Sequence, residues 1–420
     1  MIESKKQILC IHYYYPPIRS GGVIRNYYFS RAFGHFFEHV HVVTTSNVEV
    51  MEQEEIEIPS HVNTYPVKTN DFRSIITTTN HIPESRKRSW IVKFILKLKK
   101  TLPFHFWIGE GGPVYIRSAF NKSLELINKH EISHIYSSFM PYADHKIASR
   151  LKRKFPHLIW IADFRDLQVV PIYKNIFIPK INLRIERQIL KRAELLITVS
   201  EGLAKSLRKL HPKVLAVPRG IEPISTIKES AEVFTITYTG NLYQHYRDGA
   251  FFVRVLATYI QNNSLNFREL QFIYAGRDSK VWKTWFQENN IEKHFIDRGF
   301  ISRKESIELQ QNSNALLMLS SSSPEQQGVL TGKLFEYLES PVPIINVIQG
   351  SYDDEFEQLF KRLDAGKVFY TNSTSEVISY IDYLYQRFVQ GNPWRPTEQG
   401  IRERKKWDWK ARAKQILDAI

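Results

Sequence analysis

The sequence has little cysteine: Cys10 is the only one among 420 residues. No disulfide can form within the chain, and this composition fits a reducing compartment. The sequence also lacks any run of about 18 apolar residues, the length that a membrane-spanning helix requires. Its first residues show no secretory signal pattern. These absences predict a cytoplasmic protein, either free or bound at the periphery of the inner face of the cell membrane.

Acidic residues are too few to balance the basic ones. The chain has 58 Lys and Arg against 43 Asp and Glu, which gives a net charge of +15. This surplus indicates anionic partners such as nucleic acid, anionic lipid or phosphorylated small molecules. Because the sequence has neither zinc-finger spacing nor the aromatic motif of ribonucleoprotein domains, we do not expect nucleic acid to be the partner.

Strand-length apolar runs alternate with stretches of helical spacing along the whole chain. One series of such runs occupies residues 1–218, and a second series of the same kind occupies residues 233–402. Such alternation predicts an α/β protein with two doubly wound, Rossmann-like domains. The polar segment 219–232 has the composition of a linker, and residues 403–420 form a final helix. In folds of this kind ligands bind beyond the carboxyl ends of the strands, so the loops there matter most.

A Gly-Lys pair opens the helical stretch "TGKLFEYLES", residues 331–340. Lys333 and Glu336 flank its apolar stripe one turn apart. A lysine at a helix start suits a phosphate, and Glu336 could accept hydrogen bonds from the two hydroxyls of a ribose. An ordinary amphipathic helix with an ion pair explains the same residues, and both alternatives stay open here. The spacing from Gly328 to Gly332 is one residue too short for a P-loop.

The stretch "HFFEH", from His35 to His39, fits the H-x-x-E-H zinc pattern letter for letter. That pattern requires both histidines on one face of a continuous helix. Gly34 and the following run "VHVVTT" predict instead that His39 begins a strand. We therefore expect no zinc site at these residues.

Seven motifs follow one another along almost the whole chain: "YYPPIRSGGVIR", "SSFMPYADHKIASRL", "IADFRDL", "ITVSEGLAKSL", "VPRGIE", "YTGNLYQHYRD" and "GVLTGKLFEYLESPVPII". Together and in this order they resemble the family-4 glycosyltransferases of GT-B fold. The resemblance implies two Rossmann-like domains facing a cleft, with the last helix returning to the first domain. It also implies transfer of a sugar from a nucleotide-sugar donor with retention of configuration. The nucleotide sugar is then the substrate, and we expect no metal and no other cofactor. Members of this family build capsule, exopolysaccharide or O-antigen chains on glycan or lipid-linked acceptors.

The resemblance places the donor site mainly in the second domain. Arg247 and Lys333 would neutralise the departing diphosphate, and Glu336 would hold the ribose. The remaining donor-side positions follow strands or start helices: Gly21, Gly22, Arg25, Gly240, Gly276, Arg277, Gly299, Thr331 and Gly332. Glycines let a backbone approach a diphosphate closely, although a plain turn explains Gly21 and Gly22 as well. The family has a glutamate where this sequence has Gly328, which leaves open how the hydroxyls of the donor sugar are held.

The resemblance also suggests acceptor-side residues in the first domain. His145 is a candidate to contact the donor sugar or to orient the acceptor hydroxyl, and imidazole suits proton transfer. The alternative is a lone surface histidine. Asp163, Arg165 and Asp166 end a strand, where they could position an acceptor, or Arg165 could pair internally with its neighbours.

Segment 86–100, "RKRSWIVKFILKLKK", mixes basic and apolar residues. A basic amphipathic helix of this kind can lie on an anionic membrane. The alternative is a helix packed on the domain with a solvated basic face. We favour membrane contact, because the family often glycosylates lipid-linked acceptors.

Two other functions compete with glycosyl transfer. A catalytically silent GT-B-like binding protein is suggested by Gly328 at the usual glutamate position. A nucleotide-sugar epimerase of the same fold would need cleft acids, and the sequence offers no obvious set of them. Turnover of a nucleotide sugar separates an enzyme from a binding protein.

Overall fold

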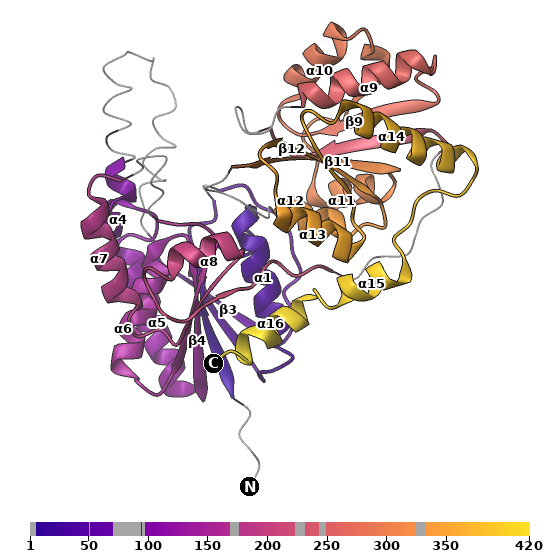
Figure 1. Cartoon of the computed structure of the whole chain (residues 1–420). Helices are drawn as coiled ribbons and strands as arrows, with labels where there is room; N and C mark the ends of the chain where they lie inside the picture. Colours follow the sequence, from indigo (N-terminus) through magenta and orange to yellow (C-terminus); the bar gives the residue numbers. More distant parts are fainter. Residues whose placement is uncertain are drawn as a thin grey trace. The chain divides into compact units, whose positions relative to one another are not determined.

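The computed structural model describes residues 6–49, 51–69, 94, 97–168, 176–222, 232–242, 249–323 and 332–420 (Figure 1). The chain divides into two compact units. Unit 1 comprises Met1–Arg219 and Trp409–Ile420, and unit 2 comprises Gly220–Asp408. Each unit has its own sheet and its own hydrophobic core. None of the helices in the described ranges is both long enough and apolar enough to pass through a bilayer.

The sheet of unit 1 has seven strands in the order β3-β2-β1-β4-β5-β6-β7. All the neighbouring pairs are parallel. The strands are β1 (Gln7–Ile11), β2 (Val40–Thr45), β3 (Val62–Val67), β4 (Ile132–Phe139), β5 (Ile159–Phe164), β6 (Leu195–Thr198) and β7 (Val214–Ala216). The helices are α1 (Gly21–Phe33), α4 (His105–Ile108), α5 (Pro113–Lys129), α6 (Tyr142–Lys154), α7 (Pro179–Leu190) and α8 (Glu201–Leu207). Because both faces of the sheet are covered, the residues of its central strands β1, β4 and β5 are mostly buried on both faces rather than alternately buried and exposed.

The sheet of unit 2 has six parallel strands in the order β10-β9-β8-β11-β12-β13. The strands are β8 (Phe234–Thr239), β9 (Leu270–Ala275), β10 (Phe295–Asp297), β11 (Ala315–Ser322), β12 (Ile344–Gly350) and β13 (Gly366–Tyr370). The helices are α9 (Ala250–Asn262), α10 (Ser279–Glu288), α11 (Arg303–Gln311), α12 (Gly332–Leu338), α13 (Asp354–Leu363), α14 (Thr374–Val389) and α15 (Glu398–Lys405). The predicted α/β class with two doubly wound domains is confirmed.

The end of the chain forms two helices rather than the single one expected over 403–420. Helix α15 belongs to unit 2, and α16 (Trp409–Leu417) belongs to unit 1. Trp409 anchors α16 on α1, because its indole stacks on Tyr28 at 4.9 Å and meets the edge of Phe29 at 5.2 Å. The last helix thus returns to the first sheet, as the resemblance implied.

Each sheet has one point where the strand order reverses direction. In unit 1 it lies between β1 and β4, and in unit 2 between β8 and β11. The loops after these strands run to opposite faces of the sheet, so a crevice opens at its carboxyl edge. These two edges are where the residues predicted from the sequence need to be located.

Candidate functional site

Backbone from three successive strands meets at the carboxyl edge of the unit 2 sheet. The Gly240 N–H donates to the carbonyl oxygen of Ala275 at 2.7 Å, and the Gly276 N–H donates to that of Gly299 at 2.8 Å. The three predicted glycines therefore lie in linked loops after β8, β9 and β10. Gly240 has φ +107° and Gly299 has φ +63°, a region that L side chains rarely adopt. A Cβ on Gly276 would lie 2.5 Å from the carbonyl oxygen of Gly240, so the close approach requires glycine there too.

Lys333 brings a positive charge to the same edge. It lies in the first turn of α12, and its Nζ is 3.6 Å from the centre of the Tyr238 ring. A Cβ on Gly240 would lie 3.1 Å from this Nζ. The Tyr238 hydroxyl, in turn, donates to the carbonyl oxygen of Asn241 at 3.1 Å. The absence of a side chain at Gly240 thus leaves the lysine room to lie over the aromatic ring, where a cation–π contact favours it.

Glu336 lies one turn further along α12, and Gln310 of α11 holds it in place. Gln310 Nε2 donates to Glu336 Oε1 at 2.8 Å and to Thr239 Oγ1 at 2.9 Å. Tyr337 fixes the same region from below, since its hydroxyl accepts the Thr239 N–H at 3.0 Å. Helices α11 and α12 are thereby tied to the end of β8. Among the described residues Glu336 Oε2 has no hydrogen-bond partner, so this oxygen remains available to a ligand.

Arg277 and Gly332 complete the described part of this edge. The Arg277 N–H donates to Asn241 Oδ1 at 3.2 Å, and its guanidinium lies 4.3 Å from the centre of the Phe300 ring. Gly332 is the exposed first residue of α12. Arg277 is exposed as well, so it offers charge at the rim of the edge rather than inside it.

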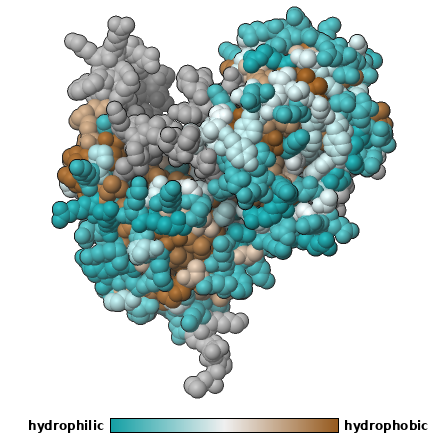
Figure 2. All heavy atoms as spheres, viewed as in Figure 1, coloured by the Kyte–Doolittle hydropathy of each residue, from teal (hydrophilic) through white to brown (hydrophobic). Residues whose placement is uncertain are grey.

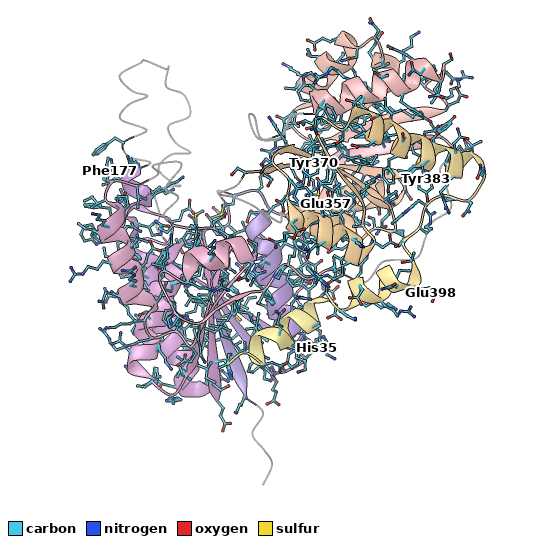
Figure 3. All side chains as sticks on the ribbon, viewed as in Figure 1. His35, Phe177, Glu357, Tyr370, Tyr383 and Glu398 are labelled. Carbon is cyan, nitrogen blue, oxygen red and sulfur yellow. The ribbon has the colours of Figure 1, made fainter. Side chains whose placement is uncertain are left out.

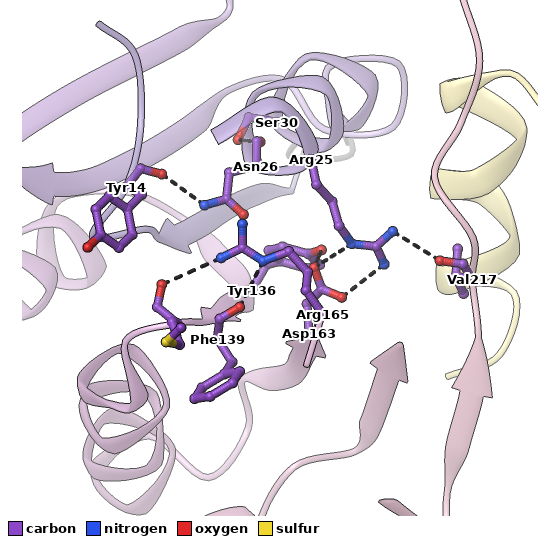
Figure 4. A network of polar contacts seen from close by, with 10 residues as sticks. Tyr14, Arg25, Asn26, Ser30, Tyr136, Phe139, Asp163, Arg165 and Val217 are labelled. Carbon is purple, nitrogen blue, oxygen red and sulfur yellow. Dashed lines mark hydrogen bonds and ion pairs between the residues drawn. The ribbon is translucent and has the colours of Figure 1, made fainter. Parts of the chain in front are cut away.

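In unit 1, the sequence-predicted residues Arg25 and Asp163 bind each other (Figure 4). Arg25 Nε and Nη2 donate to the two carboxylate oxygens at 2.8 and 2.9 Å, and Nη1 donates to the Val217 carbonyl oxygen at 3.0 Å. The Tyr136 hydroxyl also donates to Asp163, and burial together with that carboxylate raises the pKa of this phenol. Arg25 was predicted as a donor-side residue, but its guanidinium donors are used within the protein. Asp163 is equally buried and occupied.

Arg165 lies against the first turn of α1. A Cβ at Gly22 would overlap the Arg165 guanidinium, so this glycine makes room for an arginine of the same unit. Arg165 Nε donates to the Phe139 carbonyl oxygen at 2.9 Å, while Nη1 is buried and has no partner among the described residues. Internal pairing with its neighbours was one of the two alternatives for Arg165, and its observed hydrogen bonds go to backbone carbonyl groups rather than to carboxylates. Gly21 starts the helix, and Asp166 is exposed beside the cluster.

His145 is completely buried, so the alternative of a lone surface histidine is wrong. Its Nδ1 is 2.8 Å from Ser137 Oγ, and its ring lies 4.6 Å from that of Phe164. Burial, with a contribution from the Arg165 charge, lowers the pKa of His145 to about 3. The imidazole is therefore neutral at physiological pH. Its Nε2 is also buried and has no hydrogen-bond partner in the described parts of the chain.

Sequence reasoning did not identify His12, which follows β1. Its side chain is fully buried, and neither ring nitrogen has a partner among the residues that the structure describes. Burial and the Arg165 charge lower its pKa to about 3. The ring stacks on Tyr15 at 6.0 Å and meets the edge of Tyr136 at 5.5 Å. Its place directly after the first strand, at the sheet edge where ligands bind, is the signal that could have found it.

The sequence matches no protein-family model and no curated protein. Solved structures nevertheless resemble this one over nearly the whole length of both chains. Sucrose-phosphate synthase from Thermosynechococcus elongatus aligns over 99% of this chain and 98% of its own, with TM-score 0.57 and 14% identity. The lipopolysaccharide outer core galactosyltransferase WaaB aligns over 98% of both chains, with TM-score 0.55 and 12% identity. A glycosyltransferase from Rickettsia africae covers 99% and 97%, with TM-score 0.58 and 13% identity.

The chain has the GT-B fold. This agrees with the resemblance drawn from its motifs, and at such identities it establishes the architecture alone. Within the GT-B architecture, unit 2 carries the predicted glycines, Lys333 and Glu336 at one sheet edge. Arg247 and Thr331 lie outside the described residues, as does Gly328.

Two unit 2 residues of this GT-B chain were absent from the sequence-based prediction. Tyr238 lies under Lys333, and Gln310 fixes Glu336. Tyr238 stands two residues before Gly240 in the run "FTITYTG", and this place near the end of β8 is the signal that could have identified it. No local pattern distinguishes Gln310, because its role depends on the packing of α11 beside α12.

The histidines of "HFFEH" do not share a helix. His35 follows the end of α1 at Phe33, and His39 directly precedes β2. Of the predicted membrane segment 86–100, the structure describes only residues 94 and 97–100. In that part Lys99 pairs with Glu110 at 3.2 Å, and Phe94 lies 5.0 Å from the ring of Phe177.

Proposed function

We propose that this protein is a glycosyltransferase that moves a sugar from a nucleotide-sugar donor to a glycan or lipid-linked acceptor. The observation that carries the proposal is the placement of Lys333 over Tyr238 and beside Gly240. This placement brings a cation next to backbone that carries no side chain. Both lie at the edge of a doubly wound sheet, near the point where the strand order reverses. Diphosphates suit such an edge, because they need positive charge and close backbone approach.

In this proposal Lys333 and Arg247 stabilise the negative charge that develops on the departing nucleoside diphosphate. Electrostatic stabilisation of this kind supplies most of the catalysis in a site that uses no metal. Glu336 accepts hydrogen bonds from the ribose through Oε2, since Oε1 is already bound to Gln310. The loops at Gly276, Arg277 and Gly299 lie near the nucleoside.

His145 acts on the sugar or acceptor as a neutral imidazole. Its pKa of about 3 excludes a standing positive charge, and Ser137 already occupies Nδ1. In this proposal the substrate therefore contacts the Nε2 atom of His145. We further propose retention of configuration, metal-independent transfer and a place in the biosynthesis of capsule, exopolysaccharide or a related surface polysaccharide, with segment 86–100 at the membrane.

The test begins with a thermal-shift panel of UDP, GDP, dTDP and ADP sugars on the full chain, because a ligand that binds the folded state raises its melting temperature. The donor that stabilises the protein is then incubated with it, and the released nucleoside diphosphate is measured. Release of the diphosphate with formation of a glycosylated product supports the proposal. Stabilisation without turnover identifies a silent binding protein, the alternative suggested by Gly328. Conversion of the donor to an epimer identifies an epimerase.

A matched pair of variants connects the activity to the site. Glu336→Ala should weaken binding of the nucleoside diphosphate by roughly tenfold or more, since a hydrogen bond to a charged group is worth about 1.5–3 kcal/mol. Glu308→Ala, on the exposed face of α11, is the control and should bind normally. Equal affinity in both variants would remove Glu336 from the donor site.

A further inference from the structure

A groove of about 360 Å³ runs between α6 and α7 on unit 1. Its lining combines basic residues with a few polar and apolar ones: Lys146, Ser149, Arg150, Arg153, Arg184, Ile185, Gln188, Ile189 and Arg192. Five of these nine residues are Lys or Arg, and the lining contains no acid. We call these residues, together with the apolar rim described below, the α6–α7 surface.

The sequence builds this groove from two helical stripes. Lys146, Arg150 and Arg153 are spaced so that they share one face of α6, and Arg184 and Gln188 share one face of α7. Ser149 fastens the helices together, since its hydroxyl donates to the Ile189 carbonyl oxygen at 2.8 Å. The cations are therefore held on adjoining faces of two helices that are bound to each other.

The acidic residues of α6 and α7 do not neutralise these cations, because both are buried and bonded to other groups. Asp144 is buried and accepts the Tyr13 N–H at 2.8 Å, and Glu186 is buried and accepts from Asn182 at 2.6 Å. Neither carboxylate lines the groove. Burial, with a smaller contribution from the like charge of Arg150, lowers the pKa of Lys146 to about 8.

Large apolar side chains are exposed at the start of α7 and on α4, the two helices that pack against α6. Ile178 and Ile181 are 46% and 48% exposed, and Trp107 is 64% exposed. Phe177 points outward from the same end of α7 (Figure 3). Lys146 connects the rim to the groove, because its Nζ lies 3.6 Å from the centre of the Phe106 ring on α4. Figure 2 shows hydrophobic atoms gathered at this edge of the molecule, beside hydrophilic ones.

We propose that the α6–α7 surface docks on a bilayer of acidic phospholipid, with headgroup phosphates in the groove and the exposed rim in the interfacial layer. Clustered cations attract an anionic leaflet, and tryptophan and aliphatic side chains prefer its interface. A soluble polyanion would explain the cluster of cations. It would not explain why Trp107, Ile178 and Ile181 are exposed, because it offers no apolar layer that removes these side chains from water. The inference rests on the proposed action on a lipid-linked acceptor, and it adds a second membrane contact to the one proposed for segment 86–100.

Flotation of the full chain with phosphatidylcholine vesicles, with and without phosphatidylglycerol, tests the inference. No nucleotide sugar is present, so failure here leaves glycosyl transfer untouched, and failure of transfer leaves this result untouched. The wild-type protein should float only with the anionic vesicles. Arg150→Glu/Arg184→Glu should lower the partition coefficient by roughly a hundredfold or more, since each charge near an anionic surface contributes about fivefold. Lys280→Glu/Lys283→Glu, on exposed positions of α10, has the same charge change and should float normally.

Ile181→Ser distinguishes a bilayer from a soluble polyanion. It should weaken flotation in high salt, where charge attraction is screened and apolar insertion remains. All variants are first compared with the wild type by thermal melting, because unchanged melting temperatures show that a loss of flotation is not a loss of fold. Three results would overturn the proposal: equal flotation with neutral and anionic vesicles, equal loss in the α10 control, or an Ile181→Ser variant that behaves like the wild type.

Discussion

The ammonium group of Lys333 lies 3.6 Å from the centre of the Tyr238 ring. The contact joins the first turn of α12 to β8, the strand beside which the sheet order reverses. The position of this charge is therefore set by two elements that are almost a hundred residues apart in the sequence. A cation held in place before the substrate arrives needs no rearrangement when negative charge develops.

Loss of this cation should slow the reaction itself. Lys333→Ala is expected to lower kcat by roughly a hundredfold or more, the range found when one preorganised electrostatic group is removed. The measurement is steady-state release of nucleoside diphosphate with the donor found in the thermal-shift panel. Lys304→Ala removes an exposed lysine from α11 of the same unit and should retain normal turnover. Full activity in Lys333→Ala would contradict the proposed mechanism.

Gly240 should prove sensitive for two separate reasons. Gly240→Ala places a Cβ at φ +107° and 3.1 Å from Lys333 Nζ, so it strains the backbone and displaces the cation. Gly391→Ala is the matched control, with φ +68° and no atom within 4 Å. Both should lose about 1–2 kcal/mol of unfolding free energy in urea. Only Gly240→Ala should also weaken nucleotide-sugar binding, by roughly tenfold or more. Equal binding by the two variants would show that the loop does not position Lys333.

Arg25 and Asp163 form a buried ion pair, and removing the charge of one partner should lower the free energy of unfolding. Asp163→Asn leaves the Arg25 guanidinium without its counter-ion in the interior, which is expected to cost about 3–5 kcal/mol of unfolding free energy. Asp166→Asn, at the exposed position three residues along, should change it by less than about 0.5 kcal/mol. Urea denaturation at neutral pH measures both. Similar small effects at the two positions would mean that the pair is not buried as described.

Buried His145 should make stability depend on pH in a defined direction. Its pKa is about 3 in the folded protein and near 6.5 when unfolded, so between these values the unfolded chain binds more protons. The contribution is fully present above pH of about 6.5 and is lost as the pH falls, by about 1.4 kcal/mol per pH unit. His145→Gln should therefore show a shallower loss of unfolding free energy between pH of about 6 and 4 than the wild type.

Exposed His157 provides the comparison for this prediction. His157→Gln replaces an exposed histidine and leaves buried His145 in place, so this variant should lose stability with falling pH as the wild type does. Identical slopes in His145→Gln and His157→Gln, measured by urea denaturation across the same pH range, would show that His145 is accessible to protons in the folded state.

The order of strands and helices was predictable because strand-length runs rich in apolar, aromatic and β-branched residues alternate with stretches of helical spacing. The runs "FTITYTG" and "LQFIYAG" became β8 and β9, and the glycines that end them lie at the carboxyl edge of the sheet. The single C-terminal helix was wrong in detail, since a break before Trp409 divides it between the two units. Local periodicity does not reveal where a helix changes its packing partner.

Three features could be predicted from the amino-acid order alone: the alternation of strands and helices, the two-domain α/β class and the glycines that follow the strands. Periodicity and turn chemistry act over a few residues, so they can be read locally. Three other facts could be seen only in the folded chain: Asp163 neutralises Arg25, Tyr238 lies under Lys333, and His145 is buried. Those facts depend on which strands become neighbours, and the packing that makes them so joins side chains separated by up to 138 residues.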